Sequence, residues 1–169
     1  MATRMMAASR TWLGGESANT GAPELAVRLV SALLALAVAA VHVADQGGIT
    51  AFSSPDWLGW AYRFIEVGGV LTAMVLLTPR LARLGWAAAV LLGAGPFLGY
   101  IVSRSVGVPG DPGDIGNWGY WLGTVSLIIE AALVVLSVGM LLPRRERETI
   151  SATETRSFAP QRVSRGEAR

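Results

Sequence analysis

Four long apolar runs dominate the sequence, and short polar segments separate them. The runs cover residues 24–44, 57–78, 84–103 and 118–142. About 20 mostly apolar residues, each rising about 1.5 Å along an α-helix, suffice to cross the hydrocarbon core of a bilayer. Short connections favour antiparallel neighbours. The pattern therefore predicts an all-α fold, a four-helix transmembrane bundle with up-down-up-down topology.

The ends of the chain lack this pattern. Residues 1–23 are small and polar, and residues 143–169 are charged and rich in Ser and Thr. Such segments cannot bury a core, so we expect a disordered N-terminal segment, a four-span membrane domain over 24–142 and a disordered basic tail. We expect the tail to act as a topology anchor and linker or, alternatively, to bind anionic lipid headgroups.

Arginine placement predicts the orientation. Arginines lie before the first span, between the second and third, and directly after the fourth: Arg4, Arg10, Arg80, Arg83, Arg144, Arg145 and Arg147. All four aspartates lie in the other two connections: Asp45, Asp56, Asp111 and Asp114. Because basic segments stay on the cytoplasmic side, both termini should be cytoplasmic. We expect Trp57, Trp60, Trp118 and Trp121 to form an aromatic belt at the outer membrane surface. Trp86 should mark the inner surface.

One alternative concerns the first span. The stretch VHVADQ resembles a small-residue cleavage site after Ala44, which would make residues 1–44 a long signal peptide. The long segment before the apolar core argues against cleavage, because signal peptides have short basic starts.

Composition narrows the class of protein. The 169 residues are 52% hydrophobic and 15% charged, with mean hydropathy +0.47, whereas soluble domains are nearer a quarter charged. All basic residues are Arg, which is typical of high-GC bacteria, and we expect a multi-pass protein of the bacterial cytoplasmic membrane. The formal charge of +2 is too small to indicate nucleic acid. With no Cys, one His and no nucleotide-binding loop or nucleophile elbow, we expect neither an enzyme nor a metal or cofactor.

Each predicted helix carries one stripe of small and polar residues. The four stripes are Arg28, Ser31, Ala35, Ala39 and His42; Gly59, Arg63, Glu66 and Ala73; Gly85, Ala89, Gly93, Pro96, Tyr100 and Ser103; and Gly119, Gly123, Ser126, Glu130 and Ser137. Helical spacing places each stripe on one face. Because membrane helices pack through small residues, the stripes should face the bundle interior.

Apart from Arg28 in the inner half, the ionisable residues of the spans gather in the outer half, although a charge at the bilayer centre costs about 2.5–3.5 kcal/mol. Arg63 and Glu66 are three apart and can pair on one helix. Glu130 either stays protonated, because burial disfavours the charged form, or is ionised if Arg63 reaches both acids. Such residues either hold helices in register or mark a functional pocket. The candidate polar interior site comprises His42, Arg63, Glu66, Tyr100, Arg104 and Glu130.

The third span and the following loop contain turn and packing signals. In GAGPFLG (residues 93–99), Pro96 predicts a packing kink, or alternatively a hinge or an opening into a cavity, and Gly95 and Gly99 predict close helix approach. The loop is rich in Gly and Pro, which predicts a compact turn. Asp111 and Asp114 lack the alternating spacing of a calcium loop and are interpreted as a solvated turn.

A motif follows the third span and supports a resemblance. Its residues are Ser103, Arg104, Ser105, Gly107, Val108 and Pro109, an SRSxGVP-type pattern. With His42 late in the first span and Glu130 in the last, residues 35–142 resemble a group of small, largely uncharacterised four-helix membrane proteins of high-GC bacteria. The loop GDPGDIGNW departs from the acidic or His-containing loop of those proteins. The resemblance implies four helices and no assigned reaction, and it groups His42, Arg104 and Glu130.

Three classes of function fit these features. In order of preference they are an accessory or structural membrane component, a small ligand- or proton-responsive bundle with a pocket open to the outer face, and a subunit of an oligomeric transporter. The expected partners are the lipid bilayer and then another membrane protein or a second copy of the chain.

Overall fold

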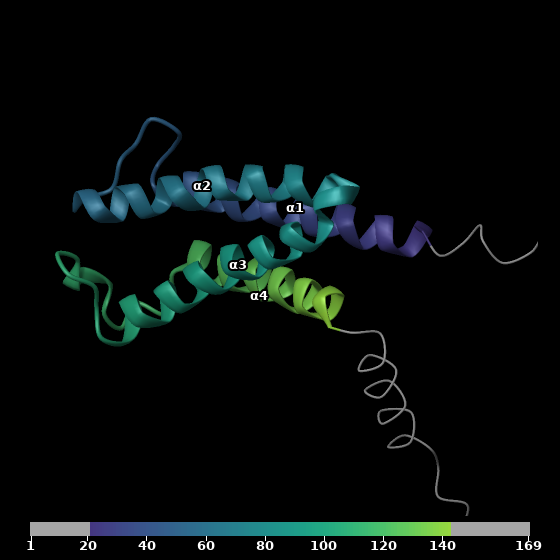
Figure 1. Ribbon diagram of the computed structural model, residues 1–169. Helices are drawn as coiled ribbons and strands as arrows, with labels where there is room; N and C mark the ends of the chain where they lie inside the picture. The colour runs from purple at the N-terminus through teal and green to yellow at the C-terminus, as the bar shows by residue number, and fades with distance from the viewer. Residues whose placement is uncertain (1–20, 143–169) are drawn as a thin grey trace, which may run out of the picture.

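The computed structural model describes residues 21–142, which form four long α-helices (Figure 1). These are α1 (Gly21–Asp45), α2 (Asp56–Leu77), α3 (Ala82–Ser105) and α4 (Trp121–Leu141), with the 3₁₀ turns η1 (Pro79–Leu81) and η2 (Pro112–Asp114) in the connections. All four helices are long and apolar enough to cross a membrane, which confirms the predicted all-α four-helix fold. Residues 1–20 of the expected N-terminal segment and the whole basic tail, with their arginines, fall outside the described residues. Residues 21–23, expected to be disordered, begin α1.

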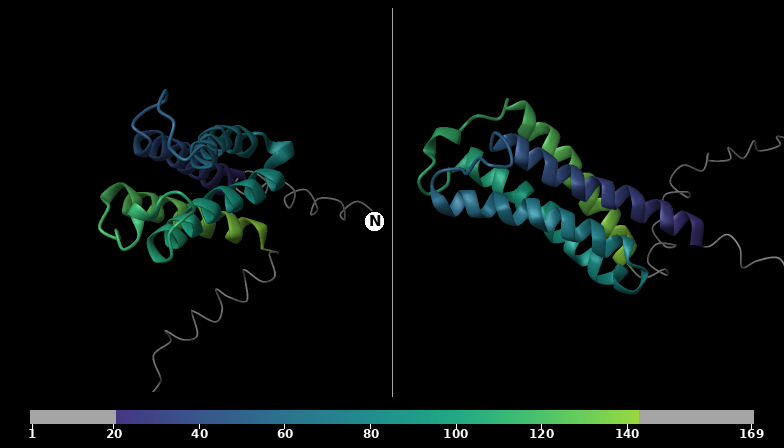
Figure 2. Two further views of the ribbon diagram at one scale, coloured as in Figure 1. Left: turned by 90° about the vertical axis from the view of Figure 1, so that its left-hand side faces the viewer. Right: turned by 90° about the horizontal axis from the view of Figure 1, so that it is seen from above.

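The helices form two antiparallel pairs. α1 packs most extensively against α2, and α3 against α4, while fewer contacts join α2 to α3 and α1 to α4. The end-on view separates the two pairs into two layers (Figure 2). We call the end that carries residues 46–55 and 106–120 the loop end, and the opposite end the η1 end. α2 and α3 meet at the η1 end and diverge toward the loop end, at the left of Figure 1.

Glycines permit the close helix crossings. A Cβ atom at Gly69 of α2 would lie 2.6 Å from the carbonyl oxygen of Ala35 in α1. At Gly85 of α3 it would lie 3.0 Å from the α2 backbone, and at Gly93 it would lie 2.8 Å from the carbonyl oxygen of Glu130 in α4. These distances are shorter than van der Waals contact, so any larger residue would push the helices apart.

The predicted stripes mostly face the interior. Every stripe residue of α1 is buried, and so are those of α4 except Gly119, which precedes the helix. They pack with an apolar core of Ala32, Ala35, Val38, Ala73, Leu76, Trp86, Ala89, Leu92 and Leu133. The prediction that Trp86 marks a membrane surface is wrong, because the residue is 3% exposed and belongs to this core. The other four predicted belt tryptophans are exposed at the loop end.

Candidate functional site

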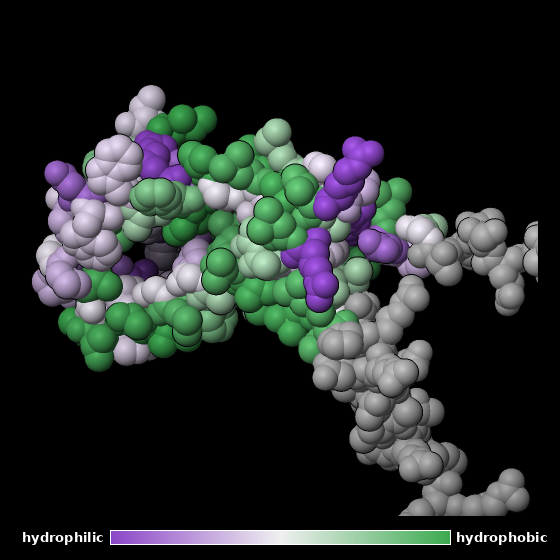
Figure 3. Space-filling view, in the orientation of Figure 1, coloured by the Kyte–Doolittle hydropathy of each residue, from purple (hydrophilic) through white to green (hydrophobic). Residues whose placement is uncertain are grey.

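A cavity of about 740 Å³ lies between the two helix pairs at the loop end. Its roof is the 106–120 loop, through Asp111 and Asp114. Its floor is formed by Glu130 at the middle of α4 and by Thr72 and Ala88, which lie nearer the η1 end of α2 and α3. Figure 3 shows the hollow opening on the side face of the bundle. The cavity thus extends from the loop end to the middle of α4 and past the middle of α2 and α3.

The wall that α3 contributes is open because it carries Gly95 and Gly99. Both residues line the cavity, and a Cβ atom at either would meet nothing within 4 Å. The prediction that they mediate close helix approach is therefore wrong, and Gly93 has that role instead. Pro96 lies between them inside a continuous helix and also lines the cavity. Among the interpretations of residues 93–99, the opening into a cavity describes the structure.

Glu130 forms the polar floor of the cavity. The residue is 1% exposed, and Ser126 Oγ donates a hydrogen bond to its Oε1 at 2.5 Å. The second oxygen, Oε2, is buried and has no hydrogen-bond partner among the described residues. A buried polar atom without a partner costs about 1–3 kcal/mol, so this oxygen is available to a hydrogen-bond donor or a cation.

His42 stands beside Glu130. Its Nδ1 lies 2.9 Å from the carbonyl oxygen of Val38, so Nδ1 carries a proton and donates it to that oxygen. In the neutral ring Nε2 is then an acceptor, and it faces Glu130 Oε1 at 3.8 Å, too far for a hydrogen bond. The ring also contacts Tyr62, with centroids 5.5 Å apart. Together His42 and Glu130 present two polar atoms that the protein does not fully engage.

Arg104 connects the roof to α3. Its guanidinium forms an ion pair with Asp114 and lies 4.8 Å from the centroid of the Tyr100 ring. Its carbonyl oxygen accepts a hydrogen bond from the Gly116 amide at 2.9 Å, which folds the loop back onto the helix end. Asp114 is therefore ion-paired and half-buried, within a turn whose other residues are mostly exposed.

Asp45 joins three helices near the roof. Its carboxylate accepts a hydrogen bond from the Tyr62 hydroxyl at 2.5 Å. Its interaction with Tyr120, chiefly hydrogen bonding, raises the pKa of Tyr120 to about 12. All three residues line the cavity. Sequence reasoning missed them because Asp45 and Tyr120 lie at helix ends, where helical periodicity no longer assigns a face.

Arg63 and Glu66 lie outside the cavity lining. Arg63 donates to Glu66 Oε2 at 2.5 Å, to the carbonyl oxygen of Ile49 at 2.6 Å and to that of Ala51. Gln46 donates to Glu66 Oε1 at 2.6 Å. This network holds the 46–55 loop against α2. Of the six candidate site residues, the structure brings His42, Tyr100, Arg104 and Glu130 to one cavity, and it uses the Arg63–Glu66 pair elsewhere.

These features define a multi-pass integral membrane protein with four candidate spans in contact with the lipid bilayer. Comparison of the chain with protein-family models, curated proteins and solved structures found no match. The resemblance through the SRSxGVP-type motif thus identifies no family. Among residues 21–142 no group of three or more His, Asp or Glu side chains is arranged to hold a metal ion.

Proposed function

We propose that the protein binds a small amphiphilic molecule in the loop-end cavity, as a binding or sensing bundle of a bacterial cytoplasmic membrane. The observation that carries this proposal is the unpartnered, buried Oε2 of Glu130 at the floor of a cavity of about 740 Å³. Ligand pockets typically measure about 300–1,000 Å³ and combine apolar walls with a few convergent polar groups.

The distribution of polar groups favours an amphiphile. Polar side chains lie at the floor and beneath the roof, whereas Ile65, Leu91 and Leu122 belong to the apolar wall. A molecule that fills the cavity must therefore carry an apolar body and at least one polar group. We propose binding without chemical turnover.

The orientation of the protein in the membrane is part of the same proposal. The exposed arginines Arg80 and Arg83 lie at the η1 end, and the four aspartates lie at the loop end. The positive-inside rule then places the η1 end and both termini in the cytoplasm and the cavity in the outer half. The accessory role that the sequence favours accounts for the Arg63–Glu66 network but gives no reason for the cavity.

The test uses three rigid aromatic probes of related shape: tetraphenylphosphonium, triphenylphosphine oxide and tetraphenylborate. Each radiolabelled probe is titrated onto the full chain in lipid nanodiscs, and binding to empty nanodiscs is subtracted. Gly99→Leu fills the cavity, and Gly139→Leu is the matched control, because a Cβ there also meets nothing within 4 Å but the residue lies outside the lining.

Saturable binding of at least one probe, lost in Gly99→Leu and kept in Gly139→Leu, supports the proposal. If no probe binds saturably, or if the two leucine variants behave alike, the cavity is not a binding site for such molecules.

A further inference from the structure

The lining of the cavity carries an excess of acidic groups. Four carboxyl groups contribute to it, those of Asp45, Asp111, Asp114 and Glu130, whereas its only guanidinium belongs to Arg104. That guanidinium is already paired with Asp114. His42 is the remaining basic side chain of the lining, and its neutral form adds no positive charge. The cavity is therefore suited to a positively charged group and unfavourable to a negatively charged one.

Aromatic side chains surround these acids. Five of them line the cavity: Trp57, Tyr62, Phe64, Tyr100 and Tyr120. Aromatic ring faces attract cations, and the attraction strengthens where water is excluded. Arg104 already lies over the Tyr100 ring, which shows that a cation can be accommodated against a ring face at this site.

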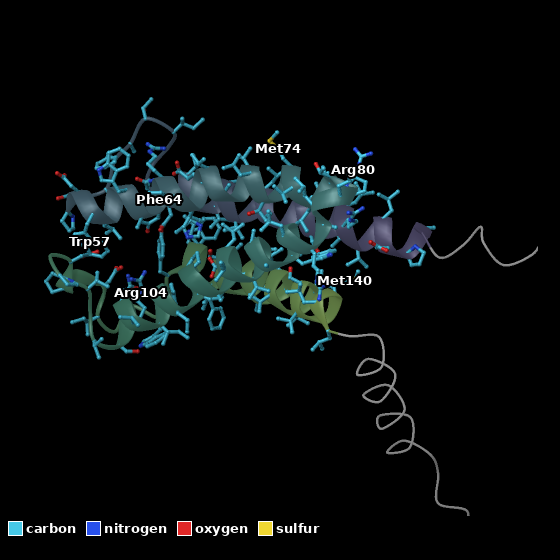
Figure 4. All side chains as sticks on the ribbon, viewed as in Figure 1. Trp57, Phe64, Met74, Arg80, Arg104 and Met140 are labelled. Carbon is cyan, nitrogen blue, oxygen red and sulfur yellow. The ribbon has the colours of Figure 1, made fainter. Side chains whose placement is uncertain are left out.

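The side opening reaches the surface that faces lipid. Phe64 of α2 and Leu91 of α3 line the cavity and are also 77% and 75% exposed. Figure 4 places Phe64 and Arg104 on opposite sides of the gap between α2 and α3. At the roof, Trp57 Nε1 donates to the carbonyl oxygen of Pro109 at 3.1 Å, which ties the loop to α2. The apolar wall is thus continuous with the membrane-facing surface, and a lipophilic molecule fits this opening.

Glu130 supplies a specific partner within this acidic, aromatic cavity. Its Oε2 is buried and unpartnered, and the residue lines the floor of the cavity, where a bound cation would be shielded from water. Charge interactions are stronger in such surroundings than in water. We propose that the molecule bound in the cavity is a lipophilic organic cation whose charge lies against Glu130. This assignment rests on the proposed function, because it names the ligand class of the same cavity.

The three probes test the assignment, because they resemble one another in bulk and differ in charge. Tetraphenylphosphonium should bind at least about tenfold more tightly than triphenylphosphine oxide or tetraphenylborate. Glu130→Gln keeps the shape of the side chain and should remove most of this preference while leaving binding of the neutral probe unchanged. The small hydrophilic cation tetraethylammonium should compete at least about tenfold more weakly than tetraphenylphosphonium, because it buries less apolar area.

A second pair of variants removes a charge without altering the floor. Asp111→Asn should weaken tetraphenylphosphonium binding about two- to fivefold, since Asp111 lines the cavity but is partly exposed to solvent. Asp56→Asn, at the same end of the bundle but outside the lining, should leave binding unchanged.

The outcomes distinguish failure of the cation assignment from failure of the proposed function. Equal or tighter cavity binding of the neutral or anionic probe overturns the cation assignment and leaves the proposed function standing. A preference for tetraphenylphosphonium that survives Glu130→Gln also overturns the assignment, and so does equal competition by tetraethylammonium. If none of the probes binds saturably, the proposed function and the assignment both fail.

Discussion

Gly93→Ala should destabilise the bundle, whereas Gly95→Ala on the same helix should not. The added Cβ at position 93 would lie 2.8 Å from the carbonyl oxygen of Glu130 and 2.8 Å from Cγ2 of Val134. Ordinary van der Waals contact begins at 3.4 Å, so α3 and α4 would have to separate by about 0.6 Å, the difference between the two distances. Overpacking of this kind typically costs about 1–3 kcal/mol.

The comparison with Gly95 isolates this steric cost. Replacing Gly by Ala within a helix stabilises it by about 0.5–1 kcal/mol, and this gain applies to both variants. At position 95 the new methyl group meets nothing within 4 Å. The free energy of unfolding of Gly93→Ala should therefore be about 1–3 kcal/mol below that of Gly95→Ala.

Equilibrium unfolding by dodecyl sulfate in mixed micelles, followed by circular dichroism, measures these free energies. The wild-type chain serves as the reference, and Gly95→Ala should equal or exceed its stability. Equal stability of the two variants would refute the close α3–α4 crossing at Gly93. A less stable Gly95→Ala variant would refute the open wall of the cavity.

Two further predictions concern the loop end. Arg63→Gln removes the donors that hold the 46–55 loop, so hydrogen exchange of its amides should accelerate, whereas the exposed Arg83→Gln should leave it unchanged; identical exchange in both variants would contradict the network. Asp45→Asn should lower the pKa of Tyr120 from about 12 toward its ordinary value near 10. Because the folded-state pKa is the higher one, this interaction stabilises the fold below about pH 10 and is lost as pH rises through about 12. Ultraviolet absorbance titration, with Tyr120→Phe identifying the Tyr120 signal, checks the change, and an unaltered titration would exclude Asp45 as its cause.

Helical periodicity was enough to predict the fold and the inward face of most helices. Glu130 illustrates why: Ser126 and Ser137 lie on the same face, and small or polar neighbours at helical spacing turn toward protein in a membrane. All three are buried. The same reasoning placed Arg28 and His42 of α1 in the interior, where the structure has them.

The position of a side chain along a span and the helix face on which it lies do not determine which partner an ionisable side chain meets. The sequence groups Arg63 and Glu66 with Glu130, because helical spacing turns all three toward the interior at or beyond the middle of their spans. The path of the 46–55 loop decides otherwise: it brings the carbonyl oxygens of Ile49 and Ala51 to the Arg63 guanidinium. Loop paths depend on turns and tertiary contacts that periodicity does not encode.

Glycine roles show the same limit. Gly93, Gly95 and Gly99 occur within one heptapeptide, yet only Gly93 faces a backbone at close range. Whether a glycine permits packing or widens a cavity depends on what lies opposite: Gly93 faces α4 within its own helix pair, whereas Gly95 and Gly99 line the cavity. A single helix sequence contains no information on which neighbour each face meets.

The cavity accounts for the carboxyl group retained near mid-span. Leu133, one turn from Glu130 toward the η1 end, lies where the pairs have converged, and it is fully buried in the apolar core. The Glu130 side chain lies beside His42 of α1 and also lines the cavity. Ser126 satisfies one of its oxygens and leaves the other unpartnered, which an apolar residue of similar size would avoid. A residue that lowers stability at a cavity is characteristic of sites selected for binding, which supports the role proposed for Glu130.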